Sequence, residues 1–197
     1  MRKHLLLALT GVVIVLAAGC AQQPAPTAQQ APQPEYRLTA TIKDIMDSIV
    51  DPNADYIWES VETIVSARGV EEKRPRTDED WKEVRRHAIA LLEATNLLQM
   101  PGRKVAQAGE KADDANVELG PEQIQELINK DHAAWNKFAG GLHDATMDVL
   151  KTIEAKDADA LLNTSDRIDT ACENCHLEYW YPSEKKPEQA PSQKGAN

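Results

Sequence analysis

The sequence predicts an all-α protein, folded as an up-down-up-down four-helix bundle. Two observations support this fold class. The 197-residue chain is dominated by Ala, Leu, Glu, Lys, Asp and Gln and contains a single Phe, a composition that favours helix. Four long segments also repeat apolar residues at intervals of three and four, the spacing of one helix face. Because the connections between these segments are mostly short, neighbouring helices are expected to be antiparallel.

The predicted bundle spans residues 37–181, and its first helix begins near Leu38. Apolar residues continue in helical register beyond Asp51-Pro52, and proline favours the first turn of a helix. We therefore expect the first helix to be kinked or broken at Pro52 and to restart there. It should end between Ala67 and Gly69.

The second helix is predicted to begin at Thr77, which forms a variant capping box with Asp80 three residues later. Met100-Pro101-Gly102 ends it, because proline and glycine stop helices. Residues 103–120 are polar and weakly periodic, which predicts a long loop; loops of this length are often functional or mobile.

The third helix should begin at Gly120-Pro121 and run for about thirty residues, with Gly140-Gly141 as a weak point inside it. Asp157 is the expected N-cap of the fourth helix, and Tyr181-Pro182 ends it. One seam of the fourth helix carries Leu161, Ser165, Ile168, Cys172, Cys175, His176 and Tyr179.

Both ends of the chain are predicted to lie outside the bundle. Residues 1–19 combine a basic start with a fourteen-residue apolar run, too short to span a membrane and typical of a signal peptide. The run ends at Cys20 in a pattern resembling the bacterial lipoprotein cleavage site; an ordinary cleavage site beside an incidental cysteine is the alternative. We expect lipid on Cys20, a disordered Pro/Gln tether over 20–36, and a disordered tail over 182–197.

The most specific motif is Cys172-Glu173-Asn174-Cys175-His176, which has the spacing of a c-type haem attachment site. Each thiol can add to one vinyl group of a haem, and the adjacent imidazole can then ligate the iron from one face. A thioredoxin-like redox pair would need a βαβ context, and a zinc site would need a second ligand pair. The sequence offers neither, so one covalent haem c near one end of the bundle is expected.

The net charge of −10 argues against nucleic-acid binding, which needs a basic patch, and could steer the protein toward a positively charged partner. The sequence contains no recognisable hydrolytic triad or phosphate-binding loop. We therefore expect a haem protein that is not an enzyme.

Met46 is the candidate for the sixth iron ligand. It lies about 12 Å from the start of the first helix, and His176 lies about 6 Å from the end of the fourth. In an up-down bundle these two helix ends meet, which puts Met46 at the level of His176; core packing is the alternative role. Met100 is a weaker candidate. Lys43 could pair with a haem propionate, and Trp180, on the face of His176, could shield the haem edge.

These residues together resemble the cytochrome c′ family, the class II c-type cytochromes, over about residues 38–181. The resemblance implies an up-down bundle with haem attached at Cys172 and Cys175 and with His176 as the proximal ligand. Some family members are five-coordinate and bind small gases, whereas others are six-coordinate with a Met in the first helix, as Met46 would be. The chain departs from the family at Trp180, where many members carry arginine.

Two functions follow as expectations. The first is a membrane-tethered periplasmic electron carrier, lipid-anchored with the outer membrane favoured, that meets a redox partner protein with a basic docking patch. The alternative is a five-coordinate haem module that binds nitric oxide or carbon monoxide. A homodimer is compatible with either function.

Overall fold

The computed structural model describes residues 36–182; the predicted signal peptide, Cys20, the tether up to residue 35 and residues 183–197 lie outside this part. The elements, in chain order, are α1 (Ile42–Ile45), the π-helical segment η1 (Met46–Val50), α2 (Asp51–Glu59), β1 (Thr63–Ser66), β2 (Gly69–Glu72), α3 (Asp78–Leu98), α4 (Pro121–Lys130), α5 (His132–Glu154) and α6 (Ala158–Tyr179).

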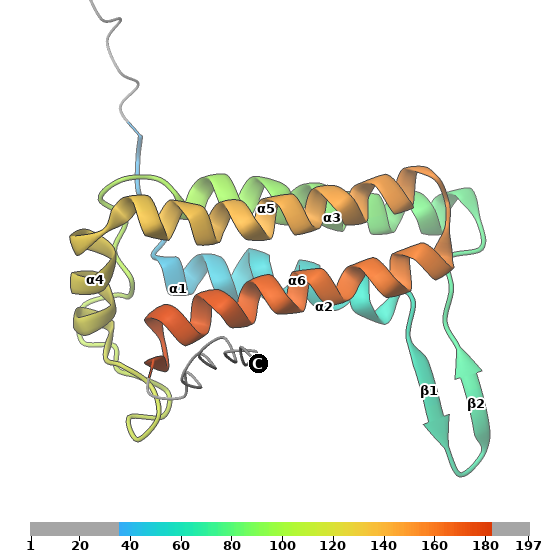
Figure 1. Ribbon diagram of the computed structural model, residues 1–197, viewed down its shortest axis with the longest axis horizontal. Helices are drawn as coiled ribbons and strands as arrows, with labels where there is room; N and C mark the ends of the chain where they lie inside the picture. Colours follow the sequence, from blue (N-terminus) through green and yellow to red (C-terminus); the bar gives the residue numbers. More distant parts are fainter. Residues whose placement is uncertain (1–35, 183–197) are drawn as a thin grey trace, which may run out of the picture. The chain divides into compact units, whose positions relative to one another are not determined.

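The described residues confirm the predicted four-helix bundle (Figure 1). Its four members are the column α1–η1–α2, then α3, α5 and α6, each antiparallel to the one before. α5 packs against both α3 and α6, and α2 also contacts both of these helices, which closes the bundle. The start of α1 and the end of α6 share one end, where α4 also lies, and the β1–β2 hairpin projects from the opposite end.

The irregularity expected at Pro52 is present, as a widened turn directly before it. Pro52 has no N–H to offer the Ser48 carbonyl, and its ring crowds that carbonyl. The hydrogen bond between Asp51 N–H and the Met46 carbonyl spans five residues, the π-helical pattern. The chain therefore stays helical through Pro52, and Met46 opens the π-helical segment.

The predicted end of the first helix, between Ala67 and Gly69, is wrong. α2 ends at Glu59, and residues 63–72 form an antiparallel hairpin in which Ser66 pairs with Gly69. The consecutive β-branched residues Thr63, Ile64 and Val65 favour extended backbone. Gly69 then adopts a φ of +125°, which side-chain-bearing residues rarely reach.

The continuous third helix is also wrong, because it divides at Asp131 into α4 and α5. Asp131 leaves helical geometry, with φ −144° and ψ 76°, and its carboxylate accepts a hydrogen bond from Ala134 N–H at 2.9 Å. An aspartate that can cap a new helix competes with helix continuation at its own position. Gly140 and Gly141, the expected weak point, lie inside the unbroken α5.

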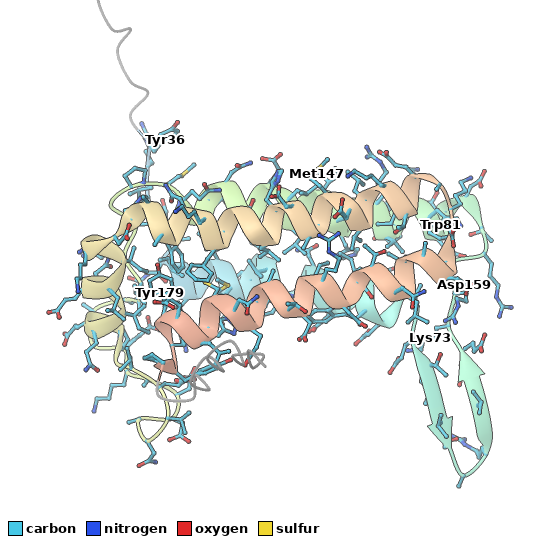
Figure 2. The ribbon with its side chains drawn as sticks, viewed as in Figure 1. Tyr36, Lys73, Trp81, Met147, Asp159 and Tyr179 are labelled. Carbon is cyan, nitrogen blue, oxygen red and sulfur yellow. The ribbon has the colours of Figure 1, made fainter. Side chains whose placement is uncertain are left out.

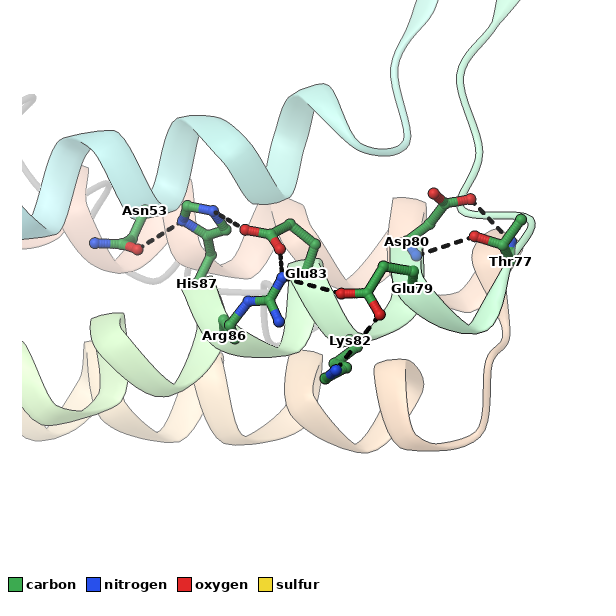
Figure 3. A network of polar contacts seen from close by, with 8 residues as sticks. All are labelled: Asn53, Thr77, Glu79, Asp80, Lys82, Glu83, Arg86 and His87. Carbon is green, nitrogen blue, oxygen red and sulfur yellow. Dashed lines mark hydrogen bonds and ion pairs between the residues drawn. The ribbon is translucent and has the colours of Figure 1, made fainter.

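The predicted helix starts at Thr77 and Asp157 are confirmed. The Thr77 hydroxyl accepts from Asp80 N–H, while the Asp80 carboxylate accepts from Thr77 N–H at 2.8 Å, completing the capping box (Figure 3). Asp157 accepts from Ala160 N–H at 2.9 Å. Residues 103–120 form no helix or strand, as predicted.

The apolar core runs along the inside of the bundle and includes fully buried Ile57, Leu91, Trp135, Leu161 and Ile168. Side chains from all four bundle members fill this interior (Figure 2). None of the helices within residues 36–182 combines the length and the apolar character that crossing a membrane requires.

Candidate functional site

The Cys-X-X-Cys-His motif lies on the last turns of α6. The helix is oriented by its inner seam, because Leu161, Ile168 and Tyr179 are almost fully buried. Cys172 and Cys175 follow this seam one turn apart, are half-buried, and form no disulfide. His176 is four residues after Cys172, so the two side chains share a face of α6.

The two thiols, His176 and Met46 line a single cavity of about 300 Å³. The volume is at the lower end of the roughly 300–1,000 Å³ typical of small-molecule sites. The cavity lies between the first helical column, α5 and the end of α6. Its full lining is Met46, Val50, Asp51, Ala54, Asp55, Trp58, Leu98, Trp135, Phe138, Ala139, Leu142, Asp169, Ala171, Cys172, Glu173, Cys175 and His176.

Aromatic residues form much of the cavity wall, and their polar atoms are satisfied elsewhere. Trp135 Nε1–H donates to the Leu98 carbonyl at 2.8 Å, and Trp58 Nε1–H donates to the Ser165 carbonyl at 3.2 Å. Phe138 meets Tyr179 edge to face, with ring centroids 5.7 Å apart. Figure 2 shows Tyr179 at the end of the bundle where α4 lies. The wall therefore offers apolar ring surface suited to a flat, apolar group.

The remaining polar lining residues are acidic: Asp51, Asp55, Asp169 and Glu173. Burial raises the pKa of the Asp51 carboxyl, while the nearby His176 acts in the opposite direction. None of the cavity-lining residues is Lys or Arg, so the wall itself would leave the propionates of a haem without a cationic partner.

Both motif thiols are held in the protonated form. Burial, together with the nearby Asp51 carboxylate, raises the pKa of Cys172 to about 11. Burial also raises the pKa of Cys175 to about 12, with Cys172 as the next contributor. Reactive redox dithiols have lowered thiol pKa values instead, so the arrangement is unlike a thioredoxin-type site.

The other candidates named from the sequence do not line this cavity. Lys43 Nζ bonds to Asp113 of the 103–120 loop at 2.7 Å, and this hydrogen bond raises the pKa of Lys43. Trp180 lies beside His176, with ring centroids 5.8 Å apart, but faces a separate small pocket with Lys43. The Met100 sulfur accepts from Arg103 Nη2 at 3.1 Å, and Met100 is also outside the cavity lining.

Trp58, Trp135 and Phe138 were not assigned to the site from the sequence, although all three line the cavity. Their signal was the position of these large aromatic residues on the apolar stripes of the first and third predicted helices. Asp51 was not assigned to the site from the sequence either; it directly follows the π-helical segment and lines the cavity.

The donor set fits a covalently attached haem. Two unpaired thiols one turn apart stand beside an imidazole, and a thioether lines the same cavity. Among residues 36–182, no group of three or more His, Cys, Asp or Glu side chains is arranged to hold a metal ion. A larger open groove of about 890 Å³ lies between α5 and α6, but neither thiol nor His176 lines it.

Comparison with protein-family models and with curated protein sequences found no match. Among solved structures, the nitric oxide complex of a leucine-to-valine variant of cytochrome c prime from Alcaligenes xylosoxidans is similar, with a TM-score of 0.44 and 17% identity over 72% of this chain and 98% of that chain. The ferrous form of this variant gives 0.43 and 15% over the same shares. The nitric oxide complex of a leucine-to-alanine variant gives 0.43 and 16% over 75% and 98%.

Proposed function

We propose that this chain is a c-type haem protein that carries one electron. The observation that supports this most is the convergence of Cys172, Cys175, His176 and Met46 on one cavity, from helices at opposite ends of the sequence. The two thiols would hold the haem, His176 would be the proximal iron ligand, and Met46 the sixth ligand. When bound, the haem supplies the one-electron couple.

The protein's own residues have three tasks in this proposal. Trp58, Trp135 and Phe138 exclude water from the cavity, which lowers the local dielectric. The two half-buried thiols lie on α6, a helix that is capped and packed into the bundle, so they would fix the position of the haem along the bundle axis. The acidic lining residues and the net charge of −10 favour a redox partner with a basic docking patch.

A membrane tether is part of the proposal. Lipidation of Cys20 after removal of residues 1–19 would anchor the protein to a bacterial membrane, with the outer membrane favoured, and the bundle would face the periplasm. The Pro/Gln-rich segment over 20–36 would let the bundle reach a partner away from the lipid.

The alternative function is binding of nitric oxide or carbon monoxide at an open iron site. The observation that bears on it is the π-helical setting of Met46, because the backbone departs from regular α-helical geometry at the residue that would ligate the iron. If this turn keeps the thioether away from the iron, Met46 serves only to line the cavity.

Visible spectra of Met46→Ala and of the unmutated protein decide between the two functions. A six-coordinate carrier should be low-spin, and Met46→Ala should become high-spin and gain carbon monoxide binding. Met147→Ala is the matched control, because Met147 packs partly buried against the core but does not line the cavity. It should stay low-spin despite a comparable loss of packing, which is up to about 2–5 kcal/mol for a fully buried Met. An unmutated ferrous protein that is already high-spin and binds carbon monoxide would overturn the carrier proposal.

A further inference from the structure

Met46 and His176 belong to elements that do not pack on each other. η1, which begins at Met46, contacts α3 and its chain neighbours α1 and α2, but not α6. α1 likewise contacts only η1 and α3 among the helices and strands of the described part. Direct packing of η1 on α6 therefore does not fix the position of Met46 relative to His176, and the cavity lies between these two elements. That position depends on what holds the start of the first helical column.

The start of α1 is bonded to the chain segment that follows α3, at the α4 end of the bundle (Figure 1). The N–H groups of Ile42 and Lys43 lie in the first turn of α1, where a helix offers them no carbonyl partner. They donate to the carbonyls of Lys104 and Val105, at 2.8 and 2.9 Å. Val105 is itself buried, and its N–H donates to Gln125 Oε1 of α4 at 3.0 Å. The segment that holds α1 is thus anchored in the bundle.

Arg103 connects the same entrance to the end of α3. Its guanidinium donates from Nη1 to the Ala40 carbonyl at 2.6 Å and from Nε to the Leu97 carbonyl at 2.8 Å. Ala40 directly precedes Thr41, the N-cap of α1, and Leu97 lies in the last turn of α3. A single side chain therefore bonds the start of the first helical column to the helix on which that column packs.

Arg103 is a buried cation, only 6% exposed, whose partners are two carbonyls and the Met100 sulfur. Among the described residues it forms no ion pair with a carboxylate, and burial lowers its pKa. The negative end of the α3 dipole offsets part of the cost of burying this charge. A buried guanidinium bonded at three atoms is held in one position, which is what a contact that positions another element requires.

We propose that Arg103 is a positioning residue for the sixth iron ligand. By bonding the start of the first helical column to the end of α3, it fixes the position of Met46 relative to His176 across the cavity. This inference rests on the proposed function, in which Met46 is the sixth ligand. When the Arg103 bonds are removed, the start of α1 is held less firmly, and the thioether occupies the sixth site for a smaller fraction of the time.

The carbon monoxide affinity of the ferrous protein measures this fraction. Carbon monoxide binds only molecules whose sixth site is open, so its apparent affinity rises in proportion to their population. Arg103→Met keeps an unbranched side chain and removes every guanidinium bond; because hydrogen bonds from charged donors are strong, it should raise the apparent affinity by about tenfold or more. Arg103→Lys keeps the charge without the forked donors and should give an intermediate affinity.

Arg74→Met is the matched control. Arg74 Nη1 also donates to two backbone carbonyls, those of Val61 and Lys73, but at the opposite end of the first helical column. The substitution additionally removes two long ion pairs, so its loss of contacts is at least comparable. It should nevertheless change the carbon monoxide affinity by less than about twofold, because its contacts are remote from Met46.

Two further measurements separate positioning from a general loss of stability. In the Met46→Ala background the sixth site is already open, so adding Arg103→Met should leave the carbon monoxide affinity unchanged. Hydrogen exchange over residues 38–46, a readout that does not use the haem, should be faster in Arg103→Met and unchanged in Arg74→Met. Circular dichroism checks that each variant is folded, and if Arg103→Met does not fold, Arg103→Lys replaces it in every comparison.

The outcomes distinguish this inference from the proposed function. If the unmutated protein is low-spin and substitution of Arg103 leaves its carbon monoxide affinity unchanged, the role of Arg103 is overturned and the carrier function stands. An equal rise in affinity in the Met46→Ala background also overturns that role, since Arg103 would then act independently of Met46. An unmutated ferrous protein that is already high-spin overturns the carrier function, and the positioning role with it.

Discussion

We expect His87 of α3 to be a main contact that holds the first helical column, α1–η1–α2, against α3. Its ring stacks on Tyr56 of α2, with centroids 3.8 Å apart and planes 12° from parallel. Its Nδ1 is 2.8 Å from Asn53 Oδ1 (Figure 3). Asn53 Nδ2 in turn donates to the Ile49 carbonyl of η1. Because the Asn53 amide N–H is committed to Ile49, Asn53 Oδ1 is the acceptor and His87 Nδ1 carries the proton.

His87→Ala removes both contacts at once. The hydrogen bond contributes about 1 kcal/mol and the ring stacking about 0.5–1.5 kcal/mol, so we expect the free energy of unfolding to fall by about 2 kcal/mol. Denaturant unfolding of the haem-loaded protein measures this directly. His143→Ala is the control, since His143 is only partly buried and its one polar contact is with the adjacent Asp144; it should change stability by less than about 0.5 kcal/mol. Equal losses from the two substitutions would refute the reasoning.

The contribution of His87 should also depend on pH. Burial, and then the charge of Arg86, lowers the pKa of His87, and the nearby Glu83 carboxylate is already paired with Arg86. The pKa of His87 is lower in the folded chain than its value of about 6.5 in the unfolded chain. As the pH falls, the unfolded chain therefore binds the proton before the folded chain does. The advantage of the unmutated protein over His87→Ala is therefore complete above about pH 6.5 and shrinks on acidification. A stability advantage that grows on acidification would contradict this. It would mean that attraction to Glu83 stabilises the protonated His87 ring by more than burial destabilises it.

Two further predictions concern the ends of the fold. Asp157→Ala should lower the free energy of unfolding by about 1 kcal/mol by removing the α6 cap. Asp159→Ala, which removes a 4.0 Å ion pair of a 92% exposed carboxylate and a negative charge in the first turn of α6, should lower it by less than about 0.5 kcal/mol in the same denaturant titration. Cys20→Ser should move the protein from the membrane fraction to the soluble fraction, or stop its processing, while haem attachment continues; unmutated protein recovered soluble and without lipid by mass spectrometry would contradict the anchor.

The bundle could be predicted because its signals are local and repeated. Three-and-four spacing marks each apolar face, and the starts at Thr77 and Asp157 follow from side chains that cap the next few residues. The errors came from competition between local preferences. Helical spacing continued through Ile64 and Val65, but a run of β-branched residues before Gly69 favoured the hairpin. Likewise, Asp131 lies within an uninterrupted helical spacing of apolar residues. Its side chain nevertheless caps α5, so that one helix ends there and a new one begins.

The candidate site could be predicted only in part. The motif at Cys172, Cys175 and His176 is contiguous, so its spacing alone identifies it. Placing Met46 opposite it needed only helix lengths and bundle topology, and the structure puts all four residues on one cavity. The acidic lining residue Asp51 and the ion pair of Lys43 with Asp113 could not be foreseen, because they depend on a π-helical turn and on the path of a long loop.

Acid–acetone extraction of the purified protein is the most direct test of covalent haem attachment. The colour should stay with the unmutated polypeptide, whereas the combined Cys172→Ala and Cys175→Ala variant, if it retains haem at all, should release it into the solvent. The thioether bonds, and not the fit of the cavity, would then hold the group. Haem that leaves the unmutated protein with the solvent, or a purified protein that carries none, would contradict the central claim.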